Sequence, residues 1–397
     1  MKVYDRNDRI AVPRPNWSNP VTVDYSFQTS IFRSRNGMER REAMRQDARV
    51  SIQYLCALKP TGMMRHMADM QAAPAEPFWV PTRWRRTSLS ALALLDQPVL
   101  EVASVPFWLV AGQRVVITDG STEEAAVVLS VVDQTVTLES DLSVSFPAGA
   151  EVMAASFARV ASQSEFQALT GQLWTANIRF DEVPGSAPQP APSYTPTTFE
   201  GRQVLMTKPN WRSPVRNGLE AALETLDSGR GIPHVTTHEI DITRTERMGF
   251  TGMSAEATDL LIAFFLWHKG QRTGFFVPSW QYDIVPKVAS TLGSSTLLVE
   301  GIEFAEAYTG SLTFDVVMVT FPNGEHQINR IASHEIVGFD SQANMVDEWQ
   351  QEVGVGARVS FCSLVRFATD TLSVRWITSE ASEVEFALRT IQNVEVA

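Results

Sequence analysis

The sequence contains very little cysteine: Cys56 and Cys362 are the only two among 397 residues. Each falls in a stretch of alternating apolar and polar residues, and neither has a partner at a spacing typical of a metal site. We therefore expect both thiols to be reduced and to pack in the core, where cysteine behaves as a small apolar side chain. No disulfide framework is implied.

Long hydrophobic runs are also absent. The longest one, DLLIAFFLW at 259–267, is less than half as long as a membrane span, and the N-terminal residues contain no apolar core that a secretory signal would need. With 44% hydrophobic and 20% charged residues, the composition is that of a globular protein, and the length suggests two to four domains. We expect a protein made in the cytosol without membrane anchoring.

Positive charge is outnumbered: 33 Lys and Arg residues stand against 45 Asp and Glu residues, which gives a net charge of −12. A surface of that sign repels the phosphates of nucleic acid, which argues against a tight DNA binder. One arginine-rich segment, residues 32–49, departs from this average. It is either a solvated face of a hairpin or a contact for phosphate or an acidic partner.

Catalytic motifs are missing as well. The sequence has no Gly-rich phosphate loop, no GxSxG elbow, no HExxH and no paired CxxC. The best metal candidate combines His234, His238 and Glu239, but on a strand the two histidines would lie roughly 13 Å apart, too far for one ion. We predict no metal site, no cofactor and no enzymatic activity.

What the sequence does contain is a repeat. The phrase PNW occurs twice, and its tryptophans, Trp17 and Trp211, are 194 residues apart. Gly37 and Gly231 have the same separation, and both fall where a long hairpin would turn. Because this spacing is close to half of the chain, the sequence predicts an internal duplication.

Each half then offers a helix after the hairpin. In the first, Met63, Met64, Met67 and Met70 recur at helical spacing, which we interpret as core packing. The second helix is expected between the N-cap Ser254 and Gly270. The outgoing arm of the second hairpin, VRNGLEAALETLDSG, looks more helical than strand-like and does not match the first arm.

An aromatic and proline-containing strand follows each helix. EPFWVPTRW and TGFFVPSW align Pro81 with Pro278 and Trp84 with Trp280. Proline removes a hydrogen-bond donor, so we expect these strands at an edge or a bend of the sheet. Tryptophans that recur at duplicated positions more plausibly pack a module than bind a sugar.

The rest of each half predicts short strands that form a small inserted barrel, at about 86–160 and about 283–367. Later strands would return to the parent sheet. The proline-rich stretch 184–199 would be a semi-rigid linker between a first module, residues 1–183, and a second module, residues 200–397. The expected fold is mainly β, with two tandem modules that each carry one packed helix.

This order of elements resembles the tail-tube fold of tailed bacteriophages. The PNW opening, the FWVP or FFVPSW strand after the helix and the barrel with Gly149-Ala-x-Val are similar to minor tail proteins at the tail tip of long-tailed phages. The resemblance covers nearly the whole chain at the level of pattern. It implies two tandem tail-tube-like domains, as in hub proteins, whereas distal tail proteins have one.

The resemblance further implies a homo-oligomeric ring, with a trimer favoured and a hexamer possible, because three chains of two modules can match a six-fold tail tube. Such a ring sits at the tail tip of the virion, contacts neighbouring tail proteins, and lets DNA pass without binding it. Arg35, Arg40 and Arg41 would contact acidic residues of an adjoining ring. Many hubs of this family carry a metal cluster or a peptidoglycan-cleaving domain, and this chain has neither the cysteines nor the length. A duplicated distal tail protein, or a central tip protein below it, therefore stays open.

One alternative function is a carbohydrate-binding or carbohydrate-cleaving β protein. The sequence has ten tryptophans and 45 acidic residues, so stacking rings and a pair of carboxylates can be imagined. This alternative predicts an open cleft with two facing carboxylates and exposed aromatic rings, in a monomer.

Overall fold

Alternating apolar residues form the strands that the sequence predicts. In β1 (Val21–Ser26) every second side chain is buried, starting from Val21. The computed structural model describes residues 9–391, apart from residues 12, 35, 73–74, 162–164, 186–191, 193–194, 213, 222, 228, 238–241 and 312. The described chain is mainly β and its strands pair antiparallel, which confirms the predicted fold class at that level.

The elements of the first half come before residue 185. In chain order they are β1 (Val21–Ser26), β2 (Thr29–Arg33), β3 (Glu39–Ala43), β4 (Arg49–Leu58), α1 (Pro60–Ala72), β5 (Phe78–Ser88), β6 (Val99–Glu101), β7 (Arg114–Thr118), β8 (Glu123–Val132), β9 (Thr135–Leu138), β10 (Glu151–Val160), β11 (Glu165–Thr170) and β12 (Leu173–Glu182).

The second half follows from residue 195. Its elements are β13 (Thr198–Phe199), β14 (Arg202–Gln203), β15 (Arg216–Glu220), β16 (Glu224–Leu226), β17 (His234–Thr236), β18 (Thr243–Ser254), α2 (Ala255–His268), β19 (Phe275–Pro278), β20 (Thr296–Val299), α3 (Glu303–Tyr308), β21 (Val316–Thr320), β22 (His326–Val337), β23 (Asp340–Met345), β24 (Arg358–Phe367), β25 (Thr371–Trp376) and β26 (Ala381–Thr390).

The same strand pairings occur in both halves. In the first, β4 lies between β1 and β12, β12 also pairs with β11 and β10, and β10 pairs with β5. In the second, β18 lies between β15 and β26, β26 also pairs with β25 and β24, and β24 pairs with β19. The two halves therefore share one topology over these strands.

The registers of these pairings agree residue by residue. Cys56 lies opposite Ala176 on β12, and Phe250, 194 residues after Cys56, lies opposite Val384 on β26. A short parallel bridge joins Ile10 to Trp79 in the first half, and another joins Val204 to Phe276 in the second. A one-residue slip would turn every side chain to the other face of the sheet, so agreement at this level indicates equivalent environments.

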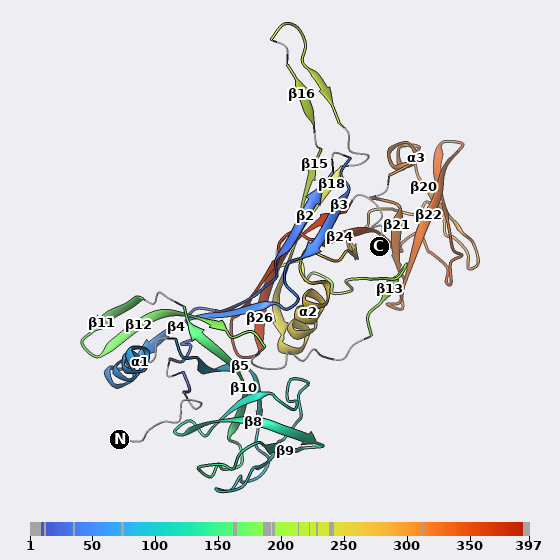
Figure 1. The fold of residues 1–397 in the computed structure, drawn as a ribbon. Coiled ribbons are helices and arrows are strands. Elements are labelled where there is room, and N and C mark those ends of the chain that lie inside the picture. The colour runs from blue at the N-terminus through green and yellow to red at the C-terminus, as the bar shows by residue number, and fades with distance from the viewer. Residues whose placement is uncertain are drawn as a thin grey trace.

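Each half also contains a closed barrel with a core of its own. In the first, pairing runs from β5 through β10, β7, β8, β9 and β6 and returns to β5 by the bridge between Leu89 and Val102. In the second, it runs through β24, β21, β22, β23 and β20, and residues 284–286 close the ring. Figure 1 shows the two barrels on separate sides of the central sheet.

The predicted helices are present, and one expectation about the second hairpin is wrong. Ser254 caps α2 by accepting a hydrogen bond from the backbone N of Ala257 at 3.2 Å, and left-handed Lys269 and Gly270 end the helix. The segment 216–226, which looked helical, forms β15 and β16 instead. Pairing of β15 with β18 and of β16 with β17 supplies hydrogen bonds that outweigh the helical propensity of the Glu, Ala and Leu residues.

Candidate assembly interface

The two halves are joined through one continuous sheet. β1 of the first half pairs with β25 of the second, with Val21 opposite Trp376 and Ser26 opposite Thr371. Their inward side chains, including Val23 and Val374, belong to a single hydrophobic core that draws on both halves. The joint is therefore built like the interior of a domain.

Helix α2 of the second half covers the first half at this joint. Ile262 of α2 and Val23 and Ile52 of the first half line a small cavity of about 60 Å³. Across it, Arg85 of β5 forms an ion pair with Asp259 of α2 at 2.6 Å. Burial raises the pKa of Asp259, and the facing Arg85 opposes that rise.

Two other ionisable groups face the same cavity. Burial raises the pKa of Glu182 to about 7, although the charge of Arg85 lowers it, and burial raises the pKa of Tyr25 to about 12. A space of this size holds a few water molecules and not a sugar ring. The nearby carboxyls of Glu182 and Asp259 therefore line an internal joint, which is not the open cleft of a glycosidase.

Aromatic side chains also meet across the joint. The ring of Trp84 on β5 stacks on Trp376 of β25, with centroids 5.5 Å apart and an interplanar angle of 19°. Phe27, after β1, packs on Phe265 of α2 at 5.8 Å. Such aromatic pairs stabilise the joint beyond the contribution of the apolar area that they bury.

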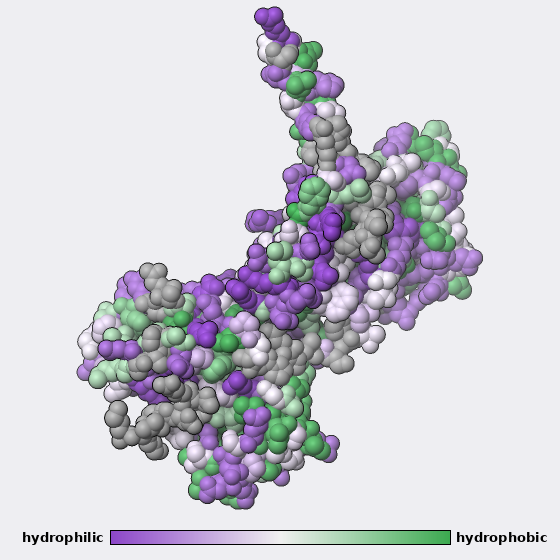
Figure 2. Space-filling model, in the orientation of Figure 1, coloured by the Kyte–Doolittle hydropathy of each residue, from purple (hydrophilic) through white to green (hydrophobic). Residues whose placement is uncertain are grey.

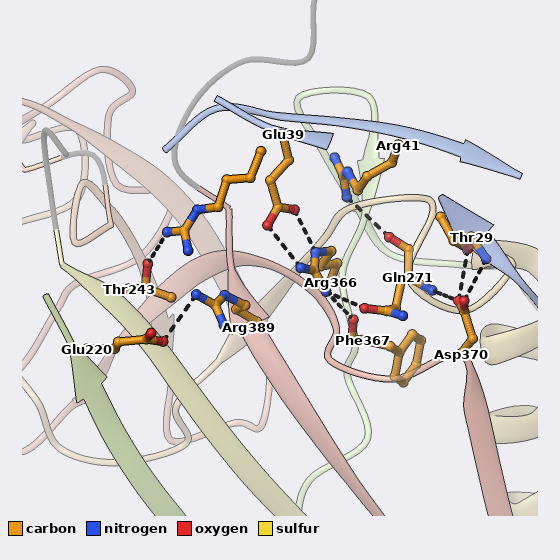
Figure 3. Close-up of polar contacts among 11 residues, drawn as sticks. Thr29, Glu39, Arg41, Glu220, Thr243, Gln271, Arg366, Phe367, Asp370 and Arg389 are labelled. Atoms are coloured by element: carbon orange, nitrogen blue, oxygen red, sulfur yellow. Dashed lines mark hydrogen bonds and ion pairs between the residues drawn. The ribbon is translucent and has the colours of Figure 1, made fainter. Parts of the chain in front are cut away.

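The β2–β3 hairpin extends the contact over the second half (Figure 3). Glu39 on β3 accepts two hydrogen bonds from Arg366 of β24, at 2.7 and 2.9 Å, and both side chains are 6% exposed. Although burial opposes it, the bonds and charge of Arg366 lower the pKa of Glu39. Thr29, Arg33 and Arg41 make further bonds to the second half, through Asp370, Thr243 and the backbone oxygen of Gln271.

The repeated PNW phrase adopts the same unusual backbone in both halves. Trp17 and Trp211 both have positive φ, 53° and 59°, which is uncommon for residues other than glycine. The Asn before each one accepts a hydrogen bond from the residue after the Trp, at 2.9 Å for Ser18 and 3.3 Å for Arg212. Trp17 packs against the shared core, whereas Trp211 is 45% exposed.

The two predicted turn glycines lie at equivalent hairpin tips. Gly37 has φ 89° and Gly231 has φ 99°, and both hairpins have the same register, with Phe32 opposite Arg40 and Leu226 opposite His234. Positive φ favours glycine at both positions.

The strand pairings align the two proline-containing strands with each other, and this alignment differs in part from the one based on residue type. Pro81 lies opposite Ala155 and Pro278 opposite Cys362, which are equivalent positions. Further along, Thr87 lies opposite Val152 and Ile284 opposite Val359, so the offset of 197 continues across the intervening bulge. This offset aligns Trp84 with Gln281 and Trp280 with Arg83, so the structure does not make Trp84 and Trp280 equivalent.

Of the three arginines expected at an inter-ring contact, the structure describes two. Arg41 donates to the backbone oxygen of Gln271 at 3.5 Å, within the chain, and Arg40 is exposed on the other face of β3. Arg35 lies outside the described residues. The residues that do join the halves, such as Arg366, Asp370, Arg85 and Asp259, carry no local sequence signal, because their partners are far away in the chain.

The shared sheet ends in two strands that are equivalent to the strands of the joint, β11 at one edge and β15 at the other. In the described residues, β11 pairs only with β12, and β15 only with β18. The β16–β17 hairpin extends away from the body (Figure 1), and Figure 2 shows hydrophobic side chains on its surface. Its exposed apolar residues are Leu223, Leu226, Ile232 and Val235.

Few groups in the described chain offer other chemistry. Cys56 and Cys362 are buried and free, as predicted, and burial raises the pKa of both thiols, that of Cys56 to about 11. Among the residues that the structure describes, no three His, Cys, Asp or Glu side chains gather as metal ligands. His234 lies on the exposed hairpin, while His238 and Glu239 lie outside the described residues. None of the described helices has the length and hydropathy needed to cross a bilayer.

The sequence matches no protein-family model, and no curated protein matches it.

Proposed function

We propose that the protein is a structural component of a bacteriophage tail tip, a hub or distal tail protein with two tail-tube-like domains. Three chains, or alternatively six, form a ring that continues the tail tube and adapts its symmetry. The chain is made in the host cytoplasm and assembled into the virion, where it contacts neighbouring tail proteins. Its role is mechanical and not enzymatic.

The observation that carries this proposal is the pairing of β1 with β25. It joins two halves of like topology edge to edge, and in the described residues each outer edge of the shared sheet, β11 and β15, has one side without a partner strand. An interface that can repeat head to tail produces a ring if its rotation closes. Closure also removes exposed strand edges, which otherwise aggregate.

The polar face of the shared sheet supports a passage for DNA. Opposite to the helices, this face carries side chains that bond to one another, such as Ser373 with Asp24 at 2.6 Å and Arg375 with Glu383 at 3.3 Å. The net charge of −12 disfavours binding of the DNA backbone. A duplex can then pass through the ring without being retained.

The mass of the purified, assembled protein tests this proposal. Native mass spectrometry is expected to give a mass of three chains, with six as the alternative, and electron microscopy is expected to show rings with a central hole. Antibodies against the protein should label the tail tip of phage particles. A single chain at high concentration, or label elsewhere on the particle, would overturn the proposal.

A further inference from the structure

The joint within the chain provides a template for the contact between chains. We propose that β15 and the β16–β17 hairpin of one copy dock on β11 and α1 of a second copy, as β1 and β2–β3 dock on β25 and α2 within the chain. This inference rests on the proposed ring and adds the surfaces and the register that would close it.

The register follows from equivalent pairings. Thr22 lies opposite Gln53 and Arg216 opposite Arg247, so a position in β1 corresponds to the one 194 residues later in β15. Likewise, Gln167 lies opposite Thr175 and Arg375 opposite Glu383, so a position in β25 corresponds to the one 208 residues earlier in β11.

Within the chain, Thr22 lies opposite Arg375 and Val23 opposite Val374. The equivalent contact places Arg216 of one copy opposite Gln167 of the next, Asn217 opposite Phe166, and Gly218 opposite Glu165. β11 and β15 would then each gain a second neighbour.

The helices supply a second contact. α1 begins at Pro60 and α2 at Ala255, and this offset of 195 aligns His66 with Leu261, which are both 1% exposed. It also aligns Met67 with Ile262, which lines the cavity of the joint. Ile262 is 2% exposed, whereas Met67 is 55% exposed.

The strand that faces α2 shows the same contrast. Tyr25 of β1 lines the cavity together with Ile262 and is 7% exposed. Its equivalent in β15 is Leu219, which is 67% exposed. Met67 and Leu219 are thus exposed apolar side chains at two positions that, in the template, are buried and line the same cavity.

The ion pair of the joint has an apolar counterpart. The offset of 197 makes Tyr282 the equivalent of Arg85, and the offset of 195 makes Met64 the equivalent of Asp259. Tyr282 is 65% exposed and Met64 is 70% exposed. A methionine sulfur packs favourably on an aromatic ring, so the two residues can form a contact where the template has a salt bridge.

Only two of the four methionines in α1 are therefore used by the fold of one chain. Met63 is 6% exposed and Met70 is half-buried against the core, while Met64 and Met67 point to solvent. The predicted core packing of these methionines is therefore confirmed for Met63 and Met70. A second copy of the chain fits the other pair, because a flexible apolar side chain adapts to a neighbouring surface.

The proposed surfaces can be tested by introducing the ion pair of the joint at the equivalent positions, 64 and 282, of the chain–chain contact. Met64→Asp alone and Tyr282→Arg alone would each bury an unpaired charge in the contact, so each is expected to weaken association by about 10-fold or more. The double variant places an Arg–Asp pair like that of Arg85 and Asp259 at the chain–chain contact. Its association constant is expected to return to within about 3-fold of the wild-type value. Met44→Asp is the matched control, since Met44 is 61% exposed outside the proposed contact.

Disulfide trapping tests the register. The variant with Arg216→Cys and Gln167→Cys should yield chains linked to one another on oxidation, because opposite residues of paired strands bring their Cβ atoms to about 5 Å. The matched variant with Thr22→Cys and Arg375→Cys should link within one chain, and Arg216→Cys with Thr170→Cys should link poorly. Cys56 and Cys362 are buried and can remain.

The outcomes separate this inference from the proposed function. A ring whose chains neither link through positions 216 and 167 nor recover with the exchanged ion pair would overturn the proposed surfaces and leave the ring standing. A single chain under all conditions would overturn both. Linked chains together with recovery would support both.

Discussion

Glu39 and Arg366, which are 327 residues apart in sequence, form a bidentate ion pair that is almost fully buried. The guanidinium also donates to the side chain of Gln271 and to the backbone oxygen of Phe367. Because its donors are paired, the cost of burying this charge is offset by its bonds. The pair fastens the first hairpin to the second half of the chain.

Glu39→Ala should therefore destabilise the protein strongly. It leaves Arg366 buried without its counter-charge, which typically costs about 3–5 kcal/mol in the free energy of unfolding. Urea unfolding followed by tryptophan fluorescence measures this loss. Glu380→Ala is the control, because its pair with Arg86 is exposed and should contribute less than about 1 kcal/mol.

The double variant with Glu39→Leu and Arg366→Met separates pairing from shape. It removes both charges and keeps apolar volume, so it should recover most of the stability lost in Glu39→Ala. A loss as large as that of the single variant would contradict a role for the unpaired charge.

Trp376→Ala should loosen the joint from its aromatic side. Trp376 is fully buried and stacks on Trp84, so its removal leaves a cavity between the halves and should cost about 3–5 kcal/mol. The stack should also give a near-UV circular dichroism signal that the variant lacks. Trp376→Phe keeps a ring in place and should lose less stability, and an equal loss for both variants would argue against the stack.

Local patterns in the sequence predicted much of the fold. Alternation located β1, and the N-cap Ser254 and Gly270 located the ends of α2. The second hairpin was different, because Leu219, Leu223 and Leu226 follow a helical spacing although Leu219 and Leu226 lie on strands of an exposed arm. Their positions reflect a surface and not the core of one chain, so the apolar pattern gave the wrong period.

The joint could not be predicted, because no local pattern encodes it. Arg366 lies in an apolar strand, and only the fold brings the first hairpin against it. Likewise, the equivalence of Trp84 and Trp280 was inferred from residue type, while the pairs Thr87–Val152 and Ile284–Val359 give a different alignment. Contacts between distant segments depend on the register of strand pairing, and a single sequence predicts this register poorly.

Glu182 should make the joint sensitive to pH. Its folded pKa is raised to about 7, mainly by burial, above the ordinary value of a glutamate. The folded state therefore holds its proton more tightly, so this contribution to stability is complete below about pH 4.5 and is lost as the pH rises through 7.

Glu182→Gln removes the charged form and should raise the free energy of unfolding at pH 8 by on the order of 2 kcal/mol. At pH 4.5 the variant and the wild type should differ little, because the wild-type carboxyl is protonated there. Urea titrations at the two pH values measure this difference. A variant that is less stable at pH 8 would show that the carboxylate is needed beside Arg85.

The first barrel should be removable without loss of the parent sheet. Ser88 lies opposite Glu151, so residues 89–150 can be replaced by the two-residue turn Asn-Gly. The core shared by both halves includes no residue between 89 and 150. Val152 loses its barrel neighbours and is best changed to Thr in the same variant, and Trp79 and Met153 lose their packing against Val116. The shortened chain should keep its strand content by circular dichroism and the oligomeric mass of the wild type.

The second half offers the matched deletion, because the bridge between Ile284 and Val359 places the same turn at an equivalent position. If both shortened chains fold and assemble, the barrels are accessories that project from the sheet, and surface loops of this kind are where recognition of other molecules is usually carried. If either one unfolds, its barrel helps to stabilise the sheet, through the clusters that join Trp79 to Val116 in the first half and Phe276 to Met318 in the second.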